Sequence, residues 1–119
     1  MKLPRSKRMR QRSEFLRVRR KGRSCRGRFM VLSCLRDETL PDFKFGFVTS
    51  RRVGNAVARV RVRRRLRSIA RKEAESLNPG HYVVLIARAG AAEASFAELK
   101  EDWLALVRRC GLLRRDAVG

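Results

Sequence analysis

The stretch from residue 54 to residue 72 constrains the fold most, because it is strongly basic and yet has a helical repeat. It reads GNAVARVRVRRRLRSIARK and holds eight Arg or Lys residues and no acid, and Arg51 and Arg52 just before it raise the count to ten. At about 100° per residue, its apolar side chains form one stripe, typical of the buried face of a helix. We expect a helix over about Ala56–Ser76, whose other faces meet water or a polyanion. The stripe consists of Ala58, Val62, Leu66, Ile69 and Ala70.

Two residues of this stretch stand out from the arginines. Asn55 is a good N-cap, and helix N-termini favour phosphate because free amide donors point outward there. Val60 projects into the basic face, beside Arg64 and Arg67 on the predicted helix. A single exposed valine is common on protein surfaces, but this one interrupts the surface that we expect to bind.

Positive charge is concentrated in the first part of the chain. Residues 1–72 hold 25 Lys or Arg against 4 acids, a net +21, whereas residues 73–119 hold 6 against 7, a net −1. This asymmetry favours a polyanionic partner, with nucleic acid ahead of an anionic membrane. The length predicts a single domain over 1–119, with residues 1–12 as a flexible or loosely docked basic arm and 111–119 as a tail.

The first half of the chain predicts a short helix and two strands. Ser13 can cap a helix over about Glu14–Arg20, and Arg28–Leu35 and Phe43–Thr49 have the composition of strands. The loop between these strands is short enough for them to pair antiparallel. Three phenylalanines alternate along the second strand and share one face. Gly46 lies on the other face, where a backbone or a ligand can approach closely.

The second half predicts a buried strand and a closing helix. His81–Arg88 is a near-continuous apolar run, as expected of a strand covered on both faces. Because the basic helix separates it from the preceding strand, these two strands are expected to be parallel. Ser95 or a neighbour caps a last helix to about Cys110, and its apolar stripe indicates a structural role.

No pattern predicts a catalytic residue or a metal site. The only histidine has no evident nucleophile beside it, and no glycine pattern matches a phosphate-binding loop. Cys25, Cys34 and Cys110 have no paired spacing, which argues against a disulfide framework or zinc and favours reduced cytosolic thiols. We expect no signal peptide, and no apolar run of about 18 residues occurs in the sequence. We expect a cytoplasmic binder of polyanions.

Acidic side chains cluster in the loop between the first two predicted strands. Asp37, Glu38 and Asp42 are candidates for magnesium ligands, although acidic loop residues are more commonly just solvated.

The segment FGFVTSRRVGNAVARVRVRRRLRSIAR resembles the signature of the bacterial ribonuclease P protein component. That family has a strand, a loop with two basic residues, Gly-Asn-Ala-Val and a basic helix, and the resemblance covers nearly the whole chain. It implies an α/β fold, an α+β two-layer sandwich of order α-β-β-β-α-β-α. It also implies a left-handed βαβ crossover, against the usual right-handed rule, as in the second domain of ribosomal protein S5.

The resemblance also implies a function. The chain is expected to be the protein subunit of a ribonucleoprotein whose RNA, with Mg²⁺, removes the 5′ leader of precursor tRNA by endonucleolytic cleavage. The protein would supply no catalytic residue and need no obligate protein partner. It would bind the catalytic RNA through the basic loop and helix, and the leader in a cleft between the sheet and the first helix.

The family motif carries over to individual residues. Phe15 matches an aromatic of the leader cleft, and Arg19 stands where some members have a second aromatic. Val60 stands where the family has Asn, so any polar contact from that position is absent. The residues that match as candidates for RNA contact are Arg51, Arg52, Asn55, Arg59, Arg61, Arg63, Arg64, Arg65 and Arg67, with Gly54 in the same motif.

Two other functions stay open on the sequence. A ribosomal or other structural RNA-binding protein would carry the same charge, and its salt dependence would be equally steep. The hypothesis that the basic helix binds in a DNA major groove has less support, because a helix that reads bases usually carries Asn or Gln.

Overall fold

A mixed sheet with strand order β1-β2-β4-β3 organises the computed structural model, which describes residues 8, 9 and 11–114. The elements follow the order α-β-β-β-α-β-α that the resemblance implied, with one additional 3₁₀ turn. The α+β class of the fold is therefore confirmed. The elements are α1 (Arg12–Lys21), β1 (Arg23–Arg26), β2 (Met30–Arg36), β3 (Phe43–Val48), α2 (Ala56–Glu73), η2 (Ala74–Ser76), β4 (His81–Ala87) and α3 (Phe96–Arg109).

Strand β4 lies at the centre of the sheet, between β2 and β3. It pairs antiparallel with β2 and parallel with β3. The predicted parallel pair is thus confirmed, but the predicted hairpin of β2 and β3 is wrong. The near-continuous apolar sequence of β4 suits the position covered on both faces. The six-residue loop 37–42 is long enough to step across one intervening strand, a distance of about 10 Å.

Strand β1 has no clear signal in the sequence. Its four residues, RSCR, are mostly exposed and polar. They pair antiparallel with β2, with Arg23 opposite Cys34 and Cys25 opposite Leu32. A short edge strand that is largely exposed to solvent does not need alternating apolar and polar residues.

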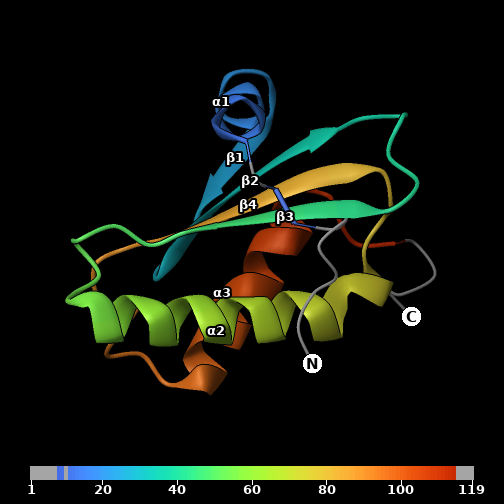
Figure 1. Cartoon of the computed structure of the whole chain (residues 1–119). Coiled ribbons are helices and arrows are strands. Elements are labelled where there is room, and N and C mark those ends of the chain that lie inside the picture. Colours follow the sequence, from blue (N-terminus) through green and yellow to red (C-terminus); the bar gives the residue numbers. More distant parts are fainter. Residues whose placement is uncertain (1–7, 10, 115–119) are drawn as a thin grey trace.

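Helices cover the two faces of the sheet unequally. Figure 1 shows α2 and α3 below the sheet and α1 above it. The larger core lies on the α2 and α3 side and includes Phe45, Leu66 and Trp103. A smaller cluster under α1 contains Met9, Val18 and Val84. In α2 the predicted stripe is buried at Val62, Leu66, Ile69 and Ala70, whereas Ala58 is only partly buried.

The caps of the helices agree with the sequence in two of three cases. Asn55 Oδ1 accepts from the Ala58 amide at 2.9 Å. Ser95 Oγ accepts from the Glu98 amide at 3.1 Å. The prediction of Ser13 as the cap of the first helix is wrong, because α1 begins after Gln11. The Glu14 carboxylate accepts from the Gln11 amide, which extends the helix by about half a turn.

Candidate nucleic-acid interface

Helix α2 and the turn before it present the basic side chains that the sequence singled out, and we call this surface the arginine face. Figure 1 shows α2 running lengthwise below the sheet. The exposed members are Arg51, Arg52, Asn55, Arg61 and Arg64, and the partly buried members are Arg59, Arg63, Arg65 and Arg67. A surface of this charge fits a chain of phosphates.

Three arginines of the face also fasten α2 to neighbouring loops. Arg63 Nη2 donates to Oγ1 of the buried Thr49 at 2.6 Å. Arg61 Nη2 donates to the Ala92 carbonyl at 3.2 Å, and Arg65 Nη1 to the Ala94 carbonyl at 3.0 Å. A guanidinium has five donors, so each keeps others for a phosphate. The bonds hold the side chains in place before any partner binds.

Arg64 has a different environment. It is exposed and lies on the outer side of α2, and no hydrogen bond or ion pair ties it to another described residue. Its charge is therefore available to a partner at no cost to the fold.

A group of three guanidiniums lies where α2 approaches the edge of β3. Burial lowers the pKa of Arg67, and the charges of Arg8 and Arg63 lower it further. The Arg67 guanidinium also lies over the Phe47 ring, 5.9 Å from its centroid. Among the described residues, no carboxylate pairs with any of the three arginines. Like charges held together in this way favour an anion between them.

Arg8 is a member of this group that the sequence did not predict. It forms an isolated bridge with Phe45 on the edge of β3, and the next amide, of Met9, donates to the Phe45 carbonyl at 2.7 Å. Successive side chains of an extended segment point to opposite faces. Met9 accordingly packs in the cluster under α1, while the charge of Arg8 reaches α2. The basic run around Arg8 gives no pattern that distinguishes it.

Val60 interrupts the arginine face, as the sequence predicted, and Val57 enlarges the apolar patch around it. Val60 is 48% exposed and Val57 is 74% exposed. With Ala56, Arg61 and Arg64 they line a shallow hollow of about 450 Å³. The patch offers contact to an apolar or aromatic group, but no hydrogen bond from position 60.

A second hollow, which we call the α1 groove, lies on the other side of the sheet. It has a volume of about 450 Å³. Its floor is apolar and comes from β3 and β4, and α1 forms its wall. Both residues that the resemblance assigned to a leader cleft line it. The lining residues are Arg12, Phe15, Leu16, Arg19, Val48, Val84 and Ile86.

Phe15 is seated in this groove by the absence of a side chain at Gly46. A Cβ added to Gly46 would lie 2.5 Å from Cε1 of Phe15 and 3.1 Å from Sδ of Met9. The close approach that the sequence predicted over this glycine is therefore made by the Phe15 ring. The ring is only partly buried, so it remains open to a ligand in the groove.

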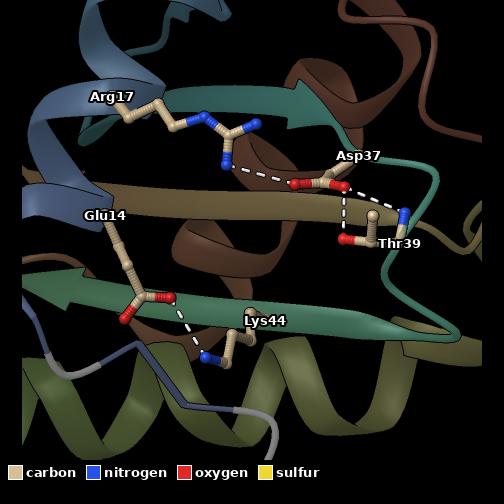
Figure 2. A network of polar contacts seen from close by, with 5 residues as sticks. All are labelled: Glu14, Arg17, Asp37, Thr39 and Lys44. Atoms are coloured by element: carbon tan, nitrogen blue, oxygen red, sulfur yellow. Dashed lines mark hydrogen bonds and ion pairs between the residues drawn. The ribbon is translucent and has the colours of Figure 1, made fainter.

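Two ion pairs hold α1 over the sheet, as Figure 2 shows. Glu14 Oε2 accepts from Lys44 Nζ of β3 at 3.1 Å. Asp37 Oδ2, just after β2, accepts from Arg17 Nη1 at 3.1 Å. Hydrogen bonds from the amide and hydroxyl of Thr39 lower the pKa of Asp37, and Arg17 lowers it further. Asp37, a candidate metal ligand in the sequence, thus serves to anchor the wall of the groove.

Neither metal clusters nor membrane spans are found in the part of the chain that the structure describes. No three His, Cys, Asp or Glu side chains among residues 8, 9 and 11–114 are placed to hold an ion together. None of the described helices is long and apolar enough to cross a bilayer.

Comparison with known sequences points to one family. The family model of ribonuclease P matches residues 3–111. The ribonuclease P protein component of Syntrophomonas wolfei is 35% identical over 115 residues, which cover 97% of this chain and 96% of the relative. That of Symbiobacterium thermophilum is 36% identical over 109 residues, covering 92% and 95%.

Comparison with solved structures agrees. The RNase P protein of Staphylococcus aureus superposes with a TM-score of 0.84 over 91% of this chain and 98% of that chain. The two sequences are 20% identical, so this match shows that the folds are alike. The RNase P protein of Thermotoga maritima superposes with a TM-score of 0.75 over 86% and 96%, at 27% identity.

Proposed function

The chain belongs to the family of bacterial ribonuclease P protein components, and on that premise we propose that its two faces bind two different RNAs. Members of this family are the protein subunits of the ribonucleoprotein that processes the 5′ end of tRNA, and the RNA subunit is their partner in the holoenzyme. We assign the arginine face to the RNA subunit and the α1 groove to the 5′ leader of precursor tRNA.

The arrangement of charge supports the first assignment. Ten Lys or Arg residues lie between Arg51 and Lys72 with no acid among them. Arg61, Arg63 and Arg65 are held by hydrogen bonds to neighbouring loops. A preorganised surface loses less conformational entropy on binding than one made of free side chains. It is suited to a large folded RNA, whose phosphates have fixed positions.

The chemistry of the groove supports the second assignment, and this is the observation that carries the proposal. Phe15 offers a partly open ring above an apolar floor, while Arg12 and Arg19 stand on the wall. Single-stranded nucleic acid is held by base stacking on aromatic rings and by cations along its backbone. A leader is single-stranded, so the groove has the two kinds of contact that it requires.

Mg²⁺ is assigned to the RNA subunit. The described residues gather no set of carboxylates that fits the ion, and the proposed RNA-binding face is cationic. The role of the protein in the reaction is then to position the RNA and neutralise phosphate. Because bound arginines replace condensed counterions, the complex needs less Mg²⁺ than the RNA alone. We place the protein in the cytoplasm, where it acts without binding a membrane or an obligate protein partner.

Reconstitution tests the proposed function. The purified chain is mixed with a bacterial ribonuclease P RNA, and cleavage of precursor tRNA is followed as Mg²⁺ is lowered. We expect no cleavage by the chain alone, and stimulation of the RNA that is largest at low Mg²⁺ and for substrates that carry a leader. Cleavage by the protein alone, or equal stimulation whatever the leader length, would contradict the proposal.

A further inference from the structure

The three cysteines, separated in the sequence, meet at one place in the fold. Cys25 is on β1, Cys34 is on β2, and Cys110 directly follows α3. Sγ of Cys110 lies 2.7 Å from Sγ of Cys25, although 85 positions separate the two residues in the chain. Cys34 lies close enough to Cys110 for each to shift the pKa of the other. All three are free thiols.

The register of β1 and β2 decides which of these thiols can pair. Arg23 is opposite Cys34, and Cys25 is opposite Leu32, so Cys25 and Cys34 are diagonal neighbours on one face of the sheet. Diagonal neighbours are about 7–8 Å apart, which exceeds the Cα separation of about 4.4–6.8 Å that a disulfide requires. Cys110 lies next to both Cys25 and Cys34. A disulfide in this cluster must therefore include Cys110.

Hydrogen bonds from arginine side chains to backbone carbonyls already hold the end of α3 against β1. Arg23 Nη1 donates to the Cys110 carbonyl at 3.2 Å, and Arg109 Nη2 donates to the Arg26 carbonyl. A disulfide bond has a sulfur–sulfur length of about 2.05 Å. The Cys25 and Cys110 sulfurs can close the remaining gap by side-chain movement, without a change in the position of either element.

Solvent reaches the cluster at Cys25 and through a hollow. Cys25 is partly exposed, whereas Cys34 and Cys110 are 6% and 3% exposed. A hollow of about 560 Å³ opens onto Cys34 and Cys110, and its other lining residues include Lys21, Arg23, Arg36 and His81. This basic lining favours an anionic reagent. None of the three cysteines lines the α1 groove or belongs to the arginine face.

We propose that Cys25 and Cys110 are a thiol oxidation site, converted to a reversible disulfide by a low-molecular-weight disulfide such as oxidised glutathione. The Cys25 thiolate attacks a sulfur of the oxidant, a mixed disulfide forms, and one glutathione thiolate leaves. Cys110 then attacks the Cys25 sulfur and displaces the second glutathione. Two protein thiols are oxidised, one oxidant is reduced to two thiols, and the two protein protons pass to the glutathiones.

The new bond joins edge strand β1 to the end of α3. It closes a long loop of the chain, which restricts the unfolded state and stabilises the fold. Burial and the contact with Cys110 raise the pKa of Cys25, so we expect the exchange to accelerate as the pH rises. The arginine face lies on α2, so binding to the RNA subunit is expected to stay unchanged.

The test treats the full chain with oxidised glutathione and records its intact mass and its peptides without reduction. We expect a mass lower by two hydrogens, a Cys25–Cys110 cross-link, a higher Tm, and reversal of all three by a reductant. Cys110→Ser should stop at a glutathione adduct on Cys25, Cys25→Ser should form no cross-link, and Cys34→Ser should behave like the wild type.

Other results would overturn the assignment. They are a persistent adduct on the wild-type chain, a cross-link between Cys34 and Cys110, or loss of the cross-link in Cys34→Ser. The Cys25→Ser variant changes a partly exposed residue and keeps the buried thiols, so a folding defect at Cys110 does not obscure the outcome. Circular dichroism of each reduced variant confirms that it is folded before treatment.

Discussion

The ring of Phe15 occupies the space that a side chain at Gly46 would fill, since an added Cβ would lie 2.5 Å from Cε1 of the ring. This relationship joins α1 to β3 and places the Phe15 ring in the lining of the α1 groove. It also couples a glycine in the middle of a strand, where glycine is usually unfavourable, to an aromatic that we assign to leader binding.

Gly46→Ala is therefore expected to displace Phe15 and damage the groove. Overpacking of this kind costs about 1–3 kcal/mol, which urea denaturation measures, and affinity for a precursor tRNA with a leader should fall with it. In the Phe15→Ala background the same substitution should cost much less, because the ring is gone. Additive effects of the two changes would show that Phe15 does not occupy this space.

Asp37→Asn tests the anchor of the groove wall through its pH dependence. The pKa of Asp37 is lowered in the folded protein, so its carboxylate stabilises the fold above its unfolded pKa of about 3.9. That contribution is lost as the pH falls through the lower, folded pKa. We expect the wild type to have the higher urea midpoint at pH 6, and the difference to shrink below about pH 4. A difference that grows on acidification would contradict this role.

Arg63 and Arg64 are adjacent in sequence but should respond differently to replacement by Ala. Arg63 bonds to the buried Thr49, so its loss should destabilise the fold by about 1 kcal/mol. Arg64 has no such bond, and Arg64→Ala should change stability by less than about 0.5 kcal/mol. It should instead weaken binding to the RNA subunit and reduce the salt dependence of that binding by about one unit of slope. Unchanged RNA affinity in Arg64→Ala would remove this residue from the interface.

Val60→Asn introduces the polar residue that the resemblance implied for this position. Val60 is 48% exposed, so stability should hardly change, and one hydrogen bond to RNA should improve affinity by about 1 kcal/mol. Val57→Asn is the matched control, because Val57 is exposed one turn earlier on the same helix. Equal gains in both variants would indicate a general effect of removing apolar surface.

The sequence predicted the elements that have a strong period and missed those set by long-range pairing. The stripe of α2 is confirmed from Val62 to Ala70 because it faces the core along its length. The parallel pairing of β3 with β4 was predicted, but nothing local indicates that β4 inserts between β3 and β2. At the candidate site, periodicity placed the arginines. The position of Arg8 depends on its pairing with the edge of β3, and the proximity of the cysteines depends on the register of the sheet. The spacing of residues along the sequence predicts neither.

The most direct test of the two-face account compares Phe15→Ala with the pair Arg61→Glu and Arg64→Glu in the same binding assays. Affinity is measured for the bare RNA subunit, and then, in the holoenzyme, for precursor tRNA with and without its leader. We predict that the arginine variant loses affinity for the RNA subunit. The Phe15 variant should keep it and lose about 1–3 kcal/mol of binding only for the substrate with a leader. Equal loss of RNA-subunit binding in both variants would contradict the account.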